Sequence, residues 1–102
     1  MKIYLAGKIT GIETEAAIAF KKAAVIITGM GHEVINPMEL PHEHDKEWSS
    51  YLKECIPAML TCDAICNLPN WTKSEGAKLE NYIAESLDIK ILDFAEYILS
   101  EQ

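Results

Sequence analysis

One glutamate has the clearest capacity for chemistry in this sequence. Glu80 lies in the stretch from Pro69 to Asp88, where apolar residues recur at helical spacing. On a helical wheel, Glu80 borders the predicted buried face, about one turn after Gly76. The first turn of a helix offers free N–H groups, so an anion can bind at its start while a reacting carbon lies beside the carboxylate. The alternative is a structural glutamate whose stem packs on the core.

The same stretch predicts where the helix starts and which face it buries. Thr72, with Glu75 three residues later, forms the pattern of a capping box. Glu85 is predicted to point away from Glu80 and toward solvent. The residues predicted to face inward are Leu79, Tyr82, Ile83, Ser86 and Leu87.

A glycine-bounded loop is the second segment with a chemical signature. Two glycines around a threonine permit positive φ angles and a close approach of the backbone to a ligand. The pattern is neither a dinucleotide fingerprint nor a Walker loop, and an ordinary strand-to-helix turn explains it equally well. The loop consists of Gly7, Lys8, Ile9, Thr10 and Gly11.

These two segments are positioned by strands that alternate with helices. Such alternation predicts an α/β protein with a three-layer, Rossmann-like or flavodoxin-like fold and a parallel sheet of about four strands in the order 2-1-3-4. A ligand crevice then opens at the carboxyl ends of strands one and three, which are followed by the glycine loop and by the helix of Glu80. Strands are predicted at Ile3–Ala6, His32–Ile35, Ala64–Leu68 and Lys90–Phe94. Helices are predicted at Glu13–Thr28, at Lys46–Leu60, after Pro69, and from Ala95 to the end.

The second of these helices carries an apolar stripe with a cysteine at its centre. Cys55 lies within the stripe, whereas Glu54 is predicted to face outward and Pro57 lies on the opposite face. The stripe consists of Trp48, Tyr51, Leu52, Cys55, Ile56 and Met59. Asp63, at the start of the third strand, is predicted to lie at the end of the sheet away from the site.

Length and charge narrow the classes of function. A chain of 102 residues predicts a single domain over residues 1–102. The formal net charge is −7 and there is no cluster of Lys and Arg, so we expect no nucleic-acid partner. Backbone amides can still hold a small anion. No apolar run reaches the roughly 20 residues of a membrane span, and we expect a cytoplasmic protein with no membrane partner.

The cysteines and histidines do not predict a metal centre or a cofactor site. Cys55, Cys62 and Cys66 are odd in number and form no C-x-x-C pair, so we expect reduced, mostly buried thiols. The run from His42 to Asp45 could bind an adventitious metal, but it lacks helical His spacing and is more typical of a solvated loop.

With these residues in view, the chain resembles the nucleoside 2-deoxyribosyltransferase-like superfamily. It is most similar to the small phage and bacterial members that carry the domain called DUF4406. The resemblance covers nearly the whole chain, and it is specific to the family only when its motifs are taken together. The motifs are KIYLAGKITG at residues 2–11, GHEVINPMEL at 31–40, CDAICNLPNW at 62–71 and SEGAKLE at 74–80.

The resemblance implies a nucleoside or nucleoside 5′-monophosphate N-glycosidase or deoxyribosyltransferase. Glu80 would attack the anomeric carbon of the sugar, with Tyr4 of the first strand beside it. The glycine loop, Ser74 and Gly76 would hold a 5′-phosphate. Trp71, or the loop after the second strand, could stack on the base.

Two positions depart from the family pattern. Cys55 stands where family enzymes carry an aspartate that serves as the acid for the departing base, and a thiol is a poor proton donor. Lys8 stands where small phage relatives often carry proline, and it would favour an anionic ligand. Whether the protein is an enzyme is therefore left open. The alternatives are a catalytically impaired nucleotide-binding module and a purely structural domain.

The superfamily also implies assembly of identical subunits. A homodimer or larger homo-oligomer could form through the C-terminal segment from Tyr97 to Gln102. Glu101 of a second subunit would then be available to replace the missing acid. The setting implied is the cytoplasm of a bacterium or of a phage-infected host.

Overall fold

Four parallel strands form one sheet in the order β2-β1-β3-β4, which confirms the predicted topology. The computed structural model describes residues 1–40 and 48–100, with the backbone only for residues 48–51. The strands are β1 (Lys2–Ala6), β2 (Glu33–Ile35), β3 (Ala64–Asn67) and β4 (Lys90–Asp93). The helices are α1 (Glu13–Gly29), α2 (Trp48–Leu60), α3 (Glu75–Ser86) and α4 (Phe94–Ser100), with short 3-10 turns η1 (Pro37–Glu39) and η2 (Trp71–Lys73).

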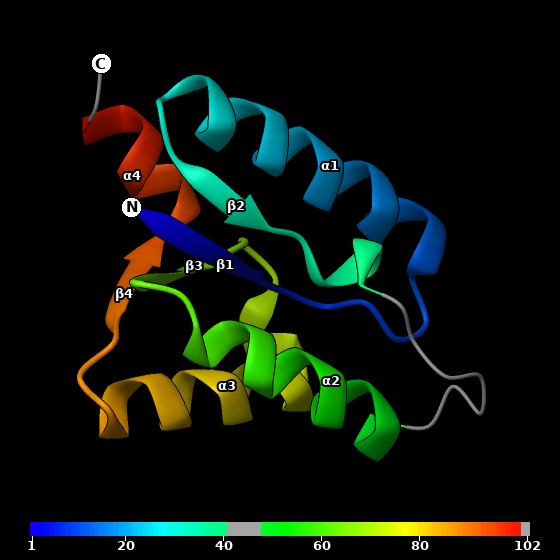
Figure 1. Cartoon of the computed structure of the whole chain (residues 1–102). Helices are drawn as coiled ribbons and strands as arrows, with labels where there is room; N and C mark the ends of the chain where they lie inside the picture. Colours follow the sequence, from blue (N-terminus) through cyan, green and yellow to red (C-terminus); the bar gives the residue numbers. More distant parts are fainter. Residues whose placement is uncertain (41–47, 101–102) are drawn as a thin grey trace.

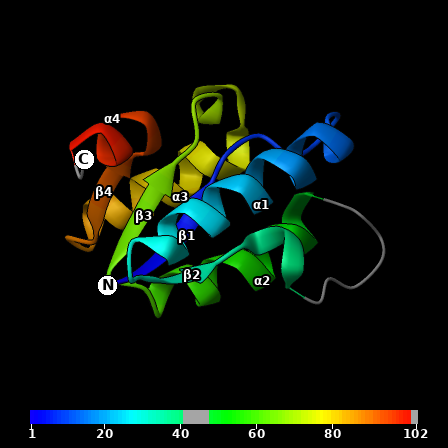
Figure 2. The same ribbon diagram turned by 90° about the horizontal axis from the view of Figure 1, so that it is seen from above.

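The helices cover the sheet on both faces and make three layers (Figures 1 and 2). Helices α1 and α4 lie on one face, and α2 and α3 lie side by side on the other. The side chains of β1 alternate between the two layers because successive strand residues point to opposite faces. Ile3 and Leu5 pack in the cluster under α1, and Tyr4 and Ala6 pack in the cluster under α2 and α3.

Helix α3 is rotated relative to its predicted face. Tyr82 and Leu87 were expected to face inward, but they are 69% and 57% exposed. Its buried residues are Ala77, Glu80, Asn81 and Ala84. Small alanines bring the helix close to the sheet, and Asn81 is hydrogen-bonded there. Glu80 is therefore deeper than its predicted place at the border of the core.

The predicted capping box at the start of α3 is wrong. Thr72 lies in η2, and the helix begins at Glu75 with Ser74 as its N-cap. The Ser74 Oγ accepts a 3.1 Å hydrogen bond from the Ala77 N–H. The chain needs the extra turn of η2 to leave β3 before it can enter α3, and this turn moves the cap two residues along.

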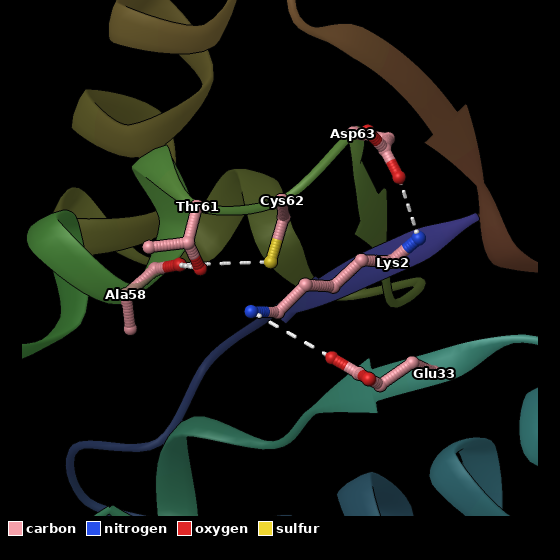
Figure 3. A network of polar contacts seen from close by, with 6 residues as sticks. All are labelled: Lys2, Glu33, Ala58, Thr61, Cys62 and Asp63. Atoms are coloured by element: carbon pink, nitrogen blue, oxygen red, sulfur yellow. Dashed lines mark hydrogen bonds and ion pairs between the residues drawn. The ribbon is translucent and has the colours of Figure 1, made fainter.

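The amino ends of the strands carry a separate polar network, shown in Figure 3. The Lys2 N–H donates a 2.8 Å hydrogen bond to Asp63 Oδ2, and Lys2 Nζ lies 3.6 Å from Glu33 Oε2. Beside them, Cys62 Sγ lies 3.5 Å from the carbonyl oxygen of Ala58. Asp63 therefore holds neighbouring strands together at the edge of the sheet opposite the candidate site.

All three cysteines are free and buried, as expected. No group of three metal-binding side chains occurs among residues 1–40 and 48–100. No helix in that part of the chain is long and apolar enough to cross a membrane. The run from His42 to Asp45, the side chains of Trp48 and Tyr51, and Glu101 lie outside the described residues.

Candidate active site

A cavity of about 300 Å³ opens at the carboxyl end of β1 and the start of α3, the helix that follows β3. Its walls come from the loop after β1, the turn η1, the middle of α2 and the first two turns of α3. The glycine loop and the helix of Glu80 thus line one cavity, as the strand order predicts. The lining side chains used below are Tyr4, Lys8, Cys55, Lys73, Ser74 and Glu80.

At the centre of the cavity, the Tyr4 hydroxyl donates a 2.5 Å hydrogen bond to Glu80 Oε2. Both side chains are almost fully buried, at 1% and 5% exposed. Burial raises the pKa of Glu80 to about 7, and the bond from Tyr4 partly opposes that rise. The pKa of Tyr4 is raised by burial and by the negative charge of Glu80, so its proton stays in place. The pair presents an oriented carboxylate that is half ionised near neutral pH.

Cys55 lines the same cavity and interacts with the same hydroxyl. Burial raises the pKa of its thiol, the hydrogen bond to Tyr4 opposes that rise, and the nearby carboxylates add to it. The resulting pKa of about 12 keeps Cys55 as a neutral thiol.

Glu54 is one of the carboxylates near Cys55. It was predicted to face outward, yet it is half-buried and its Oε2 atom is inaccessible to solvent. The prediction that Glu54 faces outward is therefore wrong, and a helical wheel does not include neighbours such as α3, which packs against α2.

The glycine loop is held against β3 by close packing and by an amide. A Cβ atom on Gly7 would lie 3.1 Å from Leu68 Cβ, 3.2 Å from Phe20 Cζ and 3.3 Å from Asn70 Oδ1. Asn70 Oδ1 also accepts a 3.1 Å hydrogen bond from the Lys8 N–H. A side chain at position 7 would therefore need its neighbours to give by a few tenths of an ångström, and Asn70 fixes the path of the loop beside the cavity.

The start of α3 faces the same cavity. Ser74 and Gly76 line it, together with Lys73 from η2. The N–H of Ala77 is already bonded to Ser74 Oγ, whereas the first-turn N–H groups of Glu75 and Gly76 precede the helix's own hydrogen bonds. These donors and the positive helix end, with Lys8 across the cavity, suit a small anion.

A buried pair of amides supports Glu80 from behind and was missed by the sequence analysis. Asn67 at the end of β3 and Asn81 on α3 donate to each other, at 2.7 and 2.8 Å. Asn81 also donates a 2.8 Å bond to the Ala77 carbonyl. The available signal was an asparagine at the end of an apolar strand and another beside Glu80 on the next helix, which single-residue hydropathy does not connect.

Two predicted binding residues do not line the cavity. Gly11 lies beyond the lining part of its loop, with a φ of 86° that allows the turn into α1. Trp71 is half-buried and packs against the core cluster under α2 and α3 instead. Pro37, from the loop after β2, does line the cavity.

A family model described as "Domain of unknown function (DUF4406)" matches residues 1–93. Among solved structures, a 2-deoxyribosyltransferase from Bacillus psychrosaccharolyticus superposes with a TM-score of 0.70. The sequences are 21% identical, and the match covers 91% of this chain and 71% of the transferase chain. At this identity the likeness shows a shared fold. No match was found among curated proteins.

Proposed function

The chain belongs to the DUF4406 family, and from that premise we propose that it cleaves or transfers the N-glycosidic bond of a nucleoside or nucleoside 5′-monophosphate. The observation that carries the proposal is the buried bond between Tyr4 and Glu80 inside a nucleotide-sized cavity. The transferase named above has the same fold, which supports a sugar-transfer reaction at this site.

In the proposed reaction, Glu80 is the nucleophile. Its ionised carboxylate adds to the anomeric carbon while the bond from that carbon to the base breaks, and the bonding electrons leave with the base. Water, or the nitrogen of a second base, then displaces the carboxylate from the sugar. Tyr4 holds Oε2 of Glu80 by its 2.5 Å hydrogen bond and so fixes the direction of attack.

The rest of the cavity binds the substrate in this proposal. Lys8, Ile9 and Thr10 of the glycine loop, with Ser74 and Gly76 at the start of α3, hold the 5′-phosphate. The base then lies toward Cys55, on the side of the cavity formed by α2 and η1. This assignment places the anomeric carbon between the two ends, beside Glu80.

A second candidate function is a binding module that holds a nucleotide without cleaving it. The observation that favours it is the neutral thiol of Cys55 at the base end, because expulsion of a neutral base needs an acid there. Such a module uses the same anion site and the same cavity.

Base release separates the two candidates. Wild type, Glu80→Ala and the control Glu85→Ala, an exposed position on the same helix, are incubated with ribo- and deoxyribonucleosides and their 5′-monophosphates. Thermal shift is read on the same samples. Release by wild type and Glu85→Ala but not by Glu80→Ala supports the enzyme. A thermal shift with a nucleotide but no base release supports the binding module. The absence of both base release and thermal shift would contradict both candidate functions.

We also propose a cytoplasmic homodimer or larger homo-oligomer. Ile91 on β4 and Leu99 on α4 are 42% and 69% exposed, which leaves apolar surface on consecutive elements for a second subunit. Sedimentation that shows only monomer at micromolar concentration would contradict this assembly.

A further inference from the structure

The base end of the cavity lacks a carboxylic acid among the lining residues that the structure describes. The ionisable side chains that line the cavity there and elsewhere are Tyr4, Lys8, Cys55, Lys73, Glu75 and Glu80. Lys8 and Lys73 belong to the anion end, and Glu75 is an exposed side chain that pairs with Lys78 at 3.0 Å. Among the α2 side chains that the structure describes, Cys55 is the ionisable one that lines the cavity.

None of these groups at the base end can give up a proton at the moment of cleavage. A neutral base leaves as an anion unless an acid protonates it. The Cys55 thiol has a pKa of about 12, and the proton of Tyr4 is held by Glu80. Glu80 cannot act as the acid because it must be ionised to attack. A base that is already positive needs no proton, since it leaves as a neutral molecule.

The charges around Cys55 favour a positive ring at the same place. Burial is the main cause of the raised thiol pKa, and the negative charges of Glu80 and Glu54 add to it. Burial disfavours a buried cation as well as a thiolate, whereas the negative charges of the two carboxylates disfavour a thiolate and attract a cation. The other end of the cavity carries Lys8, Lys73 and the N-terminus of α3. The lysines and the start of α3 are thus suited to a phosphate, and the carboxylates near Cys55 are suited to a cationic base.

We infer, on the basis of the glycosyl-transfer function proposed above, that the preferred substrates are nucleoside 5′-monophosphates whose base carries a fixed positive charge, as in N-glycosides of pyridinium or of N-alkylated purines. The carboxylate of Glu80 forms a bond to the anomeric carbon as the bond to the ring nitrogen breaks. The electron pair of that bond neutralises the ring. Water then attacks the anomeric carbon and displaces the Glu80 carboxylate, and one proton is released to solvent.

Two matched pairs of substrates test the inference at pH 7. The first pair is 7-methylguanosine 5′-monophosphate and guanosine 5′-monophosphate, each with ribose and with deoxyribose. The second pair is nicotinamide mononucleotide and its reduced, uncharged form. Base release is followed by chromatography and corrected for release without protein. We expect kcat/KM for the charged member to exceed that for the neutral member by about 100-fold or more, the usual contribution of a general acid.

Substitutions at Cys55 and Glu54 link the preference to the structure. Cys55→Asp supplies an acid and is expected to reduce the ratio of kcat/KM between the charged and the neutral substrate, because it speeds release of the neutral base. Cys55→Asn has the shape of the aspartate variant but no acid, so the ratio is expected to stay high. Glu54→Gln is expected to weaken binding of the charged member and leave that of the neutral member unchanged. Because Glu54 is only half-buried, Glu54→Gln also tests the inference if the variants at the buried Cys55 do not fold.

The outcomes separate this inference from the function on which it rests. Release of charged and neutral bases at similar kcat/KM would overturn the inference and leave the glycosidase proposal intact. Release of no base from any substrate would overturn both. A high ratio in wild type that falls in Cys55→Asp but not in Cys55→Asn is the result that we expect.

Discussion

The hydroxyl of Tyr4 lies 2.5 Å from Oε2 of Glu80 and joins the first strand to the third helix across the interior of the protein. Burial raises the pKa of Glu80 to about 7, and the bond from Tyr4 opposes that rise, so more of the carboxylate form is present near neutral pH than burial alone would allow. One residue of this pair supplies the charge and the other its orientation. Several predictions about stability and rate depend on that division.

Glu80→Gln should stabilise the protein at alkaline pH. The pKa of Glu80 in the folded state, about 7, lies above its ordinary value of 4.5, so the native protein binds more protons between those limits. Stability therefore falls as the pH rises from about 4.5 to 7 and levels off above it. At pH 8 the buried charge costs about 3 kcal/mol. Thermal unfolding should show a higher Tm for Glu80→Gln at pH 8 and little difference at pH 4.5. An equal difference at both pH values would count against a buried, shifted carboxyl.

Tyr4→Phe should move the pH profile of base release toward higher pH. The tyrosine bond lowers the pKa of Glu80, so its loss leaves burial unopposed and raises that pKa above about 7. We expect kcat/KM at pH 7 to fall by about 10- to 100-fold and to recover partly at pH 9, because the carboxylate form returns there. Measurement of kcat/KM from pH 5 to 9 checks this. A profile with the wild-type midpoint and a uniformly lower rate would show that Tyr4 does not tune Glu80.

The Asn67–Asn81 pair should contribute as a unit. Asn81→Leu leaves the buried amide of Asn67 without its partner, which costs about 1–3 kcal/mol of folding free energy. The double variant Asn67→Leu with Asn81→Leu should cost less than the sum of the two single variants, since no amide is then stranded. Urea unfolding of the four proteins gives the coupling energy. Strict additivity would mean that the two amides act independently.

Gly7→Ala and Gly29→Ala should have opposite effects. A methyl group at position 7 contacts Leu68, Phe20 and Asn70 at 3.1–3.3 Å, so the loop must shift, at about 1–3 kcal/mol. Position 29, at the end of α1, has nothing within 4 Å of an added Cβ, and alanine there should gain up to about 1 kcal/mol. Chemical denaturation with and without inorganic phosphate measures both effects. Unchanged stability and phosphate binding in Gly7→Ala would contradict a constrained loop.

The order of the strands could be predicted from sequence because it depends on local patterns and general topological rules. Short apolar runs alternate clearly with segments of helical periodicity, and parallel crossovers leave few arrangements. That order was enough to bring Lys8, Glu80 and Ser74 to one cavity. Their roles in binding and catalysis remain predictions.

The face of α3 could not be predicted in the same way. Tyr82 and Leu87 are more apolar than Asn81, so a hydrophobic wheel turns them inward. The structure buries Asn81 because its amide is paired with Asn67, and Ala77 and Ala84 because they are small. A side-chain pair of this kind joins residues 14 positions apart, and a helical wheel drawn for one segment does not contain it. The positions of Glu54 and Trp71 also differ from those expected, because the burial of each side chain depends on neighbours from other elements.

The most direct test of the account is to look for the sugar on Glu80. The reaction of wild type and Glu80→Gln with a nucleotide that releases its base is stopped with acid during turnover, and the peptides are examined by mass spectrometry. The account predicts the added mass of the sugar phosphate on the peptide that contains Glu80, and neither adduct nor base release in Glu80→Gln. Base release by Glu80→Gln at the wild-type rate, or a sugar on another side chain, would contradict it.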